Sequence, residues 1–187
     1  MEAKLIAAAK EAGVSGAVVI PVSQMVLSAQ FRDICQANQC GNFGKCWVCP
    51  PMLPPMDTVM AQLRSYTHAL WYQSVSELED SFDIEGMFAA GAAHAQLSQR
   101  LQNLIRPLLE GEILHLSCGG HLCPICAKAQ EQPCRHPDKA LPSLEGYGVD
   151  VYQTTKDTPL RYINGQNTVT YFGAVLFRLP EEMPCLC

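Results

Sequence analysis

Eight of the ten cysteines in this 187-residue chain fall in two short stretches that are rich in glycine and proline. The first stretch has the spacing C-x4-C-x5-C-x2-C, and the second has C-x4-C-x2-C-x7-C. Zinc ions and iron–sulfur clusters need several thiolates within a few ångströms, and a two-residue gap brings two thiolates onto one turn. We therefore expect all eight to be metal ligands: Cys35, Cys40, Cys46 and Cys49 in the first group, and Cys118, Cys123, Cys126 and Cys134 in the second.

The spacing of the second group favours an iron–sulfur cluster. Its first three cysteines match the opening of a plant-type [2Fe–2S] sequence, but the fourth follows too soon. A [4Fe–4S] cluster held by four thiolates fits so compact a loop better, and the two groups suggest one or two such clusters. The expected role is electron transfer to a partner, or its reductive activation.

Two other functions remain open. A structural zinc-binding module would result if the pairs Cys46/Cys49 and Cys123/Cys126 met in space as one tetrahedral site. An enzyme would result if a cluster with an open site near His121 bound a small substrate. No nucleotide-binding, hydrolase or metalloprotease motif is present, so we expect a metal-binding or electron-transfer protein more than a stand-alone enzyme, and catalytic residues stay unassigned.

Three further residues are candidate ligands. His121, inside the second group, can replace a thiolate in a mixed site. The chain ends with Cys185-Leu186-Cys187, a C-x-C pair that can bind or deliver a soft metal, form a redox pair, or fold back as a ligand. We expect residues 180–187 to form a mobile tail on a single domain that spans 1–187.

Composition limits the compartment and the partners. The net charge is −5 without a Lys/Arg patch, and no run of about 18 apolar residues is present, so we expect neither nucleic acid nor a membrane as partner. The N-terminus lacks the features of a signal peptide, which predicts the cytoplasm, where thiols stay reduced and available to metals. The expected partner is a redox protein; the oligomeric state stays open, with a homodimer among the alternatives.

The elements that position these cysteines follow from apolar patterning and from glycine and proline stops. Strands and helices alternate, which predicts an α/β or α+β fold with a small sheet of about four strands, packed helices and two cysteine-rich loops, 38–56 and 118–142. Helices are expected over 2–12, 28–37, 57–66, 84–110 and 143–155, and strands over 17–20, 68–75, 112–116 and 168–177.

Two segments resemble a family of uncharacterised, cysteine-rich predicted metal-binding proteins, found mainly in anaerobic bacteria and archaea. They are Phe31 through Cys49-Pro50-Pro51, and Pro133-Cys134-Arg135-His136-Pro137 through Val151, within a resemblance that covers about residues 17–178. The resemblance implies a metal site but no reaction. It departs from the usual pattern at Cys46, Cys118 and His121, and it supports most directly Cys35, Cys40, Cys49, Cys123, Cys126 and Cys134.

Overall fold

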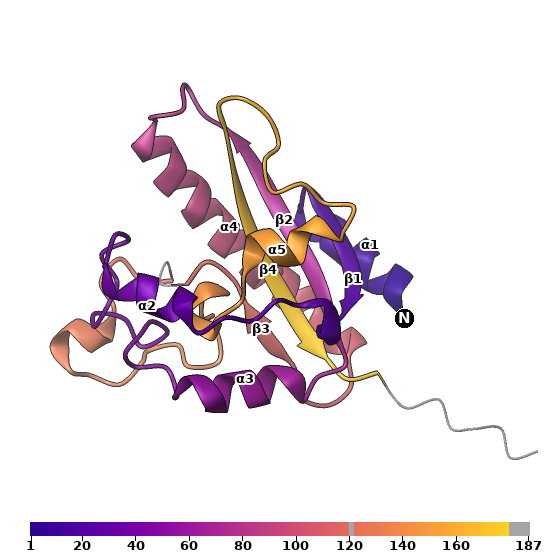
Figure 1. The fold of residues 1–187 in the computed structure, drawn as a ribbon, viewed down its shortest axis with the longest axis horizontal. Coiled ribbons are helices and arrows are strands. Elements are labelled where there is room, and N and C mark those ends of the chain that lie inside the picture. The colour runs from indigo at the N-terminus through magenta and orange to yellow at the C-terminus, as the bar shows by residue number, and fades with distance from the viewer. Residues whose placement is uncertain (120–121, 180–187) are drawn as a thin grey trace, which may run out of the picture.

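One antiparallel sheet of four strands organises the structure, a computed structural model that describes residues 1–119 and 122–179 (Figure 1). Every neighbouring pair of strands is antiparallel, so the fold belongs to the α+β class, and the expectation of about four strands is confirmed. The strands, in the sheet order β1-β2-β4-β3, are β1 (Gly16–Pro21), β2 (His68–Glu77), β4 (Thr168–Phe177) and β3 (Leu114–Leu116).

The two long central strands divide the core into two halves. They pair over ten residues, from His68 opposite Phe177 to Glu77 opposite Thr168. Successive side chains of a strand point to opposite faces. Leu70 and Tyr72 accordingly pack on one face, whereas Trp71 packs on the other.

Helices α1 (Glu2–Ala12) and α4 (Ile84–Ile105) cover the face of the sheet that carries Leu70 and Tyr72. Gly13, in the left-handed conformation with φ 95°, ends α1 as expected. At the start of α4, the Asp83 carboxylate accepts a hydrogen bond from the Gly86 amide. The predicted helix over 84–110 ends earlier, because Pro107 converts its last turn into the 3₁₀ turn η2 (Arg106–Leu108).

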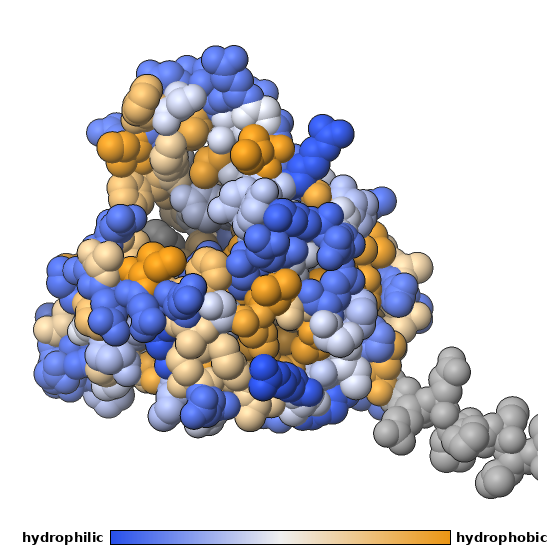
Figure 2. Space-filling model, in the orientation of Figure 1, coloured by the Kyte–Doolittle hydropathy of each residue, from blue (hydrophilic) through white to orange (hydrophobic). Residues whose placement is uncertain are grey.

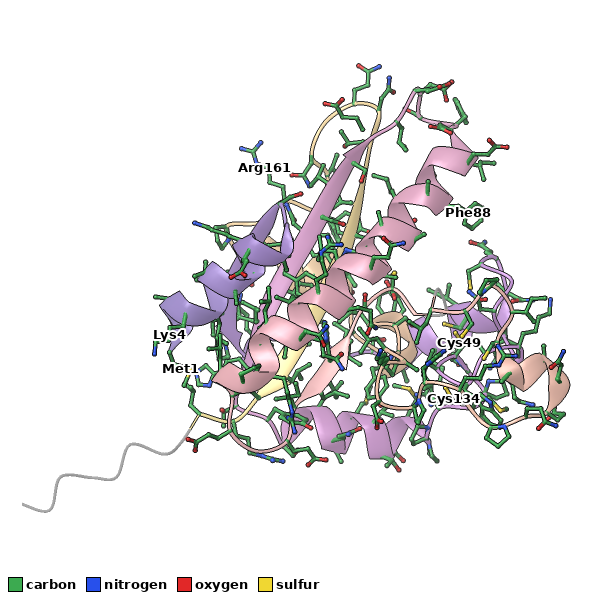
Figure 3. The ribbon with its side chains drawn as sticks, turned by 180° about the vertical axis from the view of Figure 1, so that it is seen from behind. Met1, Lys4, Cys49, Phe88, Cys134 and Arg161 are labelled. Atoms are coloured by element: carbon green, nitrogen blue, oxygen red, sulfur yellow. The ribbon has the colours of Figure 1, made fainter. Side chains whose placement is uncertain are left out.

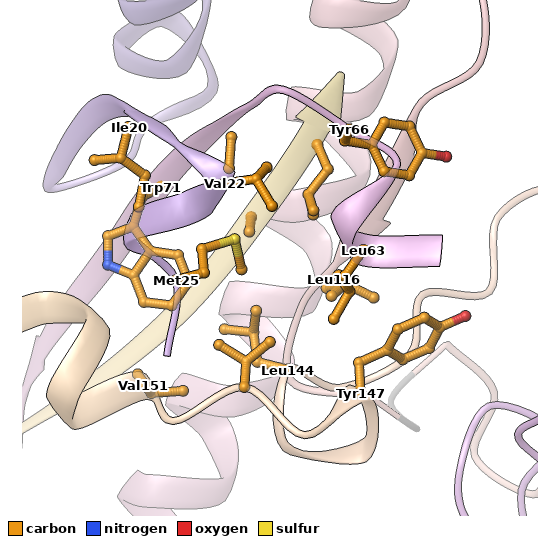
Figure 4. Packing of buried hydrophobic residues seen from close by; sticks show 14 of the residues in the cluster. Ile20, Val22, Met25, Leu63, Tyr66, Trp71, Leu116, Leu144, Tyr147 and Val151 are labelled. Carbon is orange, nitrogen blue, oxygen red and sulfur yellow. The ribbon is translucent and has the colours of Figure 1, made fainter. Parts of the chain in front are cut away.

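Helix α3 (Met56–Arg64), helix α5 (Val151–Lys156) and the segment between Leu144 and Val149 cover the second face. Figure 4 shows side chains from these segments around Trp71, Met25 and Leu116. The predicted helix over 57–66 is confirmed as α3, which starts one residue earlier. A short helix α2 (Gln30–Gln36) matches the prediction over 28–37 and leads into the first cysteine loop.

The prediction of one helix over 143–155 is wrong. The chain instead forms a 3₁₀ turn, η4 (Glu145–Tyr147), and only then α5. Gly148 separates them with φ 75°, and a Cβ there would lie 2.6 Å from Met56 Cε. Ser143 does cap the turn, because its Oγ accepts a hydrogen bond from the Gly146 amide at 3.0 Å. The turn packs against α2 and so positions the first cysteine loop.

Among the described residues, no helix is both long and apolar enough to cross a membrane.

Two further 3₁₀ turns complete the described elements: η1 (Val22–Gln24) and η3 (Ala127–Gln130). The second of these lies inside the second cysteine loop and follows directly after Cys126.

Candidate metal centre

The two cysteine loops lie together at one end of the molecule, and α1 lies at the opposite end (Figure 3). Side chains with yellow sulfur atoms surround the labelled Cys49 and Cys134, which come from the first and the second loop. All eight cysteines within the described residues are free thiols. The fold thus brings side chains that are about 85 residues apart in sequence to one region.

The first loop is a series of tight turns. Asn38, Gly41 and Gly44 have positive φ angles of 53°, 76° and 70°. The Gly44 amide donates to the Pro50 carbonyl at 2.9 Å, which closes a small loop that contains Cys46 and Cys49. Within it the Cys49 amide donates to the Cys46 carbonyl at 3.2 Å. This is the turn that a two-residue gap between metal ligands predicts.

Arg32 of α2 anchors the first loop to the rest of the protein. Its Nε and Nη2 donate to the Gly146 carbonyl at 3.0 and 2.7 Å, and its Nη1 donates to the Pro54 carbonyl. Leu53 and Pro50 pack directly on Gly146, where a Cβ would lie 2.9 Å from Leu53 Cδ1. Both ends of the first loop are therefore tied to the η4 turn.

Helix α4 and strand β3 hold the second loop. Gln99 Nε2 donates to the Lys139 carbonyl at 2.6 Å, and Gln102 Nε2 donates to the Asp138 carbonyl at 3.0 Å. Just beyond β3, the Ser117 amide donates to the Pro142 carbonyl at 2.8 Å. These bonds hold the start and the end of the second loop side by side.

Direct contacts join the two loops. The indole Nε1 of Trp47 donates to the Gln132 carbonyl at 2.8 Å. The Lys128 ammonium lies 5.3 Å from the centre of the Trp47 ring, within the range of a cation–π interaction, and forms an ion pair with Glu131 at 2.6 Å. The first loop therefore contacts the second through the residue that follows Cys46.

A pocket of about 160 Å³ lies where the loops meet α4. The side chains of Trp47, Leu122 and Leu141 contribute apolar wall, and Gln96 and Gln99 of α4 contribute polar wall. Figure 2 shows the surface hollowed on the left, between the start of α4 and the cysteine loops; the α4 residues of the pocket lie further along the helix, at Ala95, Gln96 and Gln99. Four cysteines line the pocket, one from the first loop and three from the second: Cys46, Cys123, Cys126 and Cys134.

Cys46 is the most acidic thiol of the site. The pKa of Cys46 is lowered to about 6, first by the neighbouring Cys49 thiol and then by the Val48 backbone and the Cys126 thiol, whereas burial opposes the shift. The pKa of Cys49 is raised, because its thiol donates to Cys46, is itself buried and lies near other thiols. Of this pair, Cys46 is therefore the thiol that loses its proton more readily. Metal ligation by Cys49 must release its proton.

Cys35 and Cys40 also lie near Cys49. Both are close enough for a negative charge on them to raise the pKa of Cys49. The pKa of Cys35 is itself raised, first by burial and then by the charges of Glu145 and Cys40, and the Arg32 guanidinium opposes this. Cys35, Cys40 and Cys49 thus form one neighbourhood.

Cys118 points elsewhere. Its Sγ donates to the Gly91 carbonyl of α4 at 3.6 Å, and burial raises the pKa of Cys118 to about 11, so it is a neutral thiol. The adjacent Gly119 approaches Cys49, since a Cβ on Gly119 would lie 3.9 Å from the Cys49 Sγ. The backbone at this point reaches the site, but the Cys118 side chain packs against α4.

The donor set fits a metal that prefers sulfur, because thiols from two loops line one pocket and one of them, Cys46, has a lowered pKa. Within residues 1–119 and 122–179, no three His, Cys, Asp or Glu side chains are drawn together closely enough to hold one metal ion. Metal binding therefore requires the thiols to move closer together. The remaining candidates, His121, Cys185 and Cys187, lie outside the described residues.

A buried polar network that the sequence did not predict lies beside the pocket, under α4. The Tyr72 hydroxyl is 2.7 Å from Ser98 Oγ and 2.8 Å from His115 Nε2. Ser98 Oγ in turn is 2.8 Å from Ser117 Oγ, which belongs to a residue that lines the pocket. The residues of this network are far apart in the sequence and each has apolar neighbours, so no sequence motif marks them as a group.

Replacing Arg32 with Ala should lower the free energy of unfolding of the metal-free protein by about 2 kcal/mol, because the charged donor and its three hydrogen bonds are lost. Urea unfolding measures this. Arg64→Ala is the matched control: Arg64 is exposed on α3 and should change stability by less than about 0.5 kcal/mol. Equal stability of the two variants would contradict the anchoring role of Arg32.

An antiparallel α+β fold with two thiol-bearing loops at one end defines a cysteine-rich protein built to bind metal. The model of a family described as predicted metal-binding protein (DUF2284) matches residues 18–177, and the chain belongs to that family. The resemblance drawn from the two cysteine motifs is thereby confirmed. No curated protein and no solved structure matches the chain.

Proposed function

We propose that this protein binds an iron–sulfur cluster of the [4Fe–4S] type, or two of them, and transfers electrons to a partner protein or activates it reductively. The observation that carries the proposal is the number of thiols at one end of the fold. Cys46, Cys123, Cys126 and Cys134 line one pocket, and three more thiols, those of Cys35, Cys40 and Cys49, lie next to it. One structural zinc ion needs four thiolates, whereas seven leave room for a cluster and more.

An iron–sulfur cluster supplies one-electron chemistry, and its potential depends on hydrogen bonds to sulfur and on exposure to water. The residues of this chain can control both. The Val48 amide already donates to the Cys46 sulfur. Trp47, Leu122 and Leu141 keep part of the pocket wall apolar. Cys46 is buried and its pKa is lowered, which favours the thiolate that a metal ligand requires.

Exposed apolar side chains next to the candidate ligands support a partner at this end of the molecule. Ile34, which precedes Cys35, is 59% exposed, and Ile125, which precedes Cys126, is 64% exposed. Exposed apolar side chains at a functional site favour a protein interface there.

A second candidate function, a structural zinc module, has one observation in its favour. The Cys46 thiol lies beside both the Cys49 and the Cys126 thiols, so the two C-x2-C pairs are neighbours across the loops. A single tetrahedral site that uses one pair from each loop is the arrangement that zinc requires.

Metal analysis of protein purified without oxygen separates the two candidates. The iron–sulfur proposal predicts brown protein with broad absorbance at about 400 nm, iron and acid-labile sulfide in equal amounts, and an EPR signal after reduction. Colourless protein that holds stoichiometric zinc and no sulfide would refute it and support the zinc module. Reconstitution with iron and sulfide under argon is the control against loss of a labile cluster during purification.

A further inference from the structure

The structure does not group the cysteines as the sequence does. Three separate observations concern Cys46, which belongs to the first loop by sequence. It lines the pocket together with three cysteines of the second loop, it lies beside the Cys126 thiol, and it is 5% exposed. Cys49, only three residues later, does not line that pocket; its thiol lies beside that of Cys46 and also near Cys40 and Cys35.

The contacts of Trp47 explain why Cys46 faces the second loop. The indole is held by the Gln132 carbonyl on one edge and by the Lys128 ammonium over its face. Both partners belong to the second loop. Because Cys46 directly precedes Trp47, this anchor places its backbone at the boundary between the loops.

The second loop, for its part, lacks a fourth thiol of its own at the pocket. Cys118 is the member that the spacing assigns to it, but its Sγ donates to the Gly91 carbonyl and its side chain is packed against α4. A four-thiolate centre at the pocket is therefore complete with Cys46 and not with Cys118.

On these contacts we infer that one metal centre is shared by the two loops and is held by Cys46, Cys123, Cys126 and Cys134. Cys35 of α2 forms a second thiol site with Cys40 and Cys49 of the first loop, and Cys118 is not a ligand. This inference rests on the proposed metal-binding function and gives it a ligand set that chain order does not suggest.

Thiol footprinting of the metal-loaded, full-length protein tests the grouping independently of which metal is bound. Alkylation by iodoacetamide, followed by peptide mass spectrometry, reports how strongly each cysteine is protected. The variant Cys126→Ser should increase the labelling rate of Cys46, Cys123 and Cys134 at least about tenfold and leave Cys35 protected. The variant Cys40→Ser should do the reverse, exposing Cys35 and Cys49 while Cys46 stays protected.

Cys118→Ser is the matched control within the second loop. This variant should keep the metal content of the wild-type protein, and every other cysteine should be labelled at the wild-type rate. Loss of metal in Cys118→Ser, or release of Cys46 by Cys40→Ser but not by Cys126→Ser, would overturn the inference and restore the grouping by chain order. The thermal unfolding midpoint of each metal-free variant shows whether a substitution has instead disrupted the fold.

The two proposals fail in different ways. If the protein carries zinc without sulfide, the iron–sulfur function fails, but the labelling pattern still decides the ligand grouping. In metal-free protein, the bifunctional reagent dibromobimane should link Cys46 to Cys126. Absence of that link, together with efficient linking of Cys46 to Cys40, would overturn the grouping even if iron and sulfide are present.

Discussion

The metal-free protein should lose about 4 kcal/mol of unfolding free energy between about pH 7.5 and about pH 5 through two buried histidines. Burial lowers the pKa of His94 to about 4, against a small opposing effect from the backbone near Phe172. Burial, and then the charge of His94, lower the pKa of His115 to about 3. Both histidines are therefore neutral in the folded protein at every pH above about 5.

The sign follows from proton uptake. In the unfolded chain a histidine binds its proton near pH 6.5, whereas the folded protein resists protonation until pH 4 or 3. Below pH 6.5 the unfolded state therefore binds more protons, and stability falls as the pH falls. Each histidine contributes about 2 kcal/mol of this loss at about pH 5, since one pKa unit corresponds to about 1.4 kcal/mol.

Urea unfolding at a series of pH values measures the effect. The double variant His94→Gln, His115→Gln should be less stable at neutral pH, because Tyr72 and Ser74 lose their ring-nitrogen partners, but its stability should depend much less on pH. The thiols are the same in both chains, so the difference in slope isolates the histidines. The exposed His136 provides the control variant His136→Gln, which should keep the original slope. An unchanged slope in the double variant would refute the assignment.

The second large effect is expected at Gly173, in the middle of β4. It pairs with Tyr72, and a Cβ at position 173 would lie 2.2 Å from both the Cζ and the hydroxyl oxygen of Tyr72. The Tyr72 ring cannot move aside, because it is fully buried and its hydroxyl is hydrogen-bonded to Ser98 and His115. Gly173→Ala should therefore lower the unfolding free energy by about 3 kcal/mol or more through overpacking.

Gly16→Ala is the matched control in the edge strand β1. There the added Cβ meets Leu160 Cδ2 at 2.8 Å, the end of a flexible side chain that can rotate away. A double-mutant cycle with Tyr72→Leu tests the cause, since removing the phenol should recover part of the stability lost in Gly173→Ala. Equal stability of Gly173→Ala and Gly16→Ala, or strict additivity in the cycle, would contradict the proposed clash.

Regular elements with a strong apolar pattern were predictable from the sequence. The expected strands over 68–75 and 168–177 are the two central strands, because aromatic or β-branched residues cluster in them, Trp71 and Tyr72 in the first and residues 168–172 in the second. The helix over 2–12 was predicted with its glycine stop. Errors arose where a single residue redirects the chain, at Pro107 and at Gly148, whose effects are local and do not disturb the surrounding apolar pattern.

The candidate site was predictable as a set of residues but not as an arrangement. Spacing identifies the two groups of thiols, because ligand turns are local. Which thiol faces which depends on contacts between distant segments, such as that of Trp47 with Gln132 and that of Cys118 with Gly91. These contacts follow no periodic pattern in the sequence, which placed Cys46 beside Cys123 and Cys126 only in the zinc alternative.

The separation of the hydrophobic core from the cysteine loops has a consequence for how the protein must be handled. Among the described residues, neither core cluster includes any residue of 36–52 or 122–142. Amide hydrogens of β2 and β4 should therefore exchange only on global unfolding, whereas those of the loops should exchange through local opening. Oxygen that damages the thiols would leave circular dichroism and solubility nearly unchanged. A well-folded preparation is thus no sign of an intact metal centre.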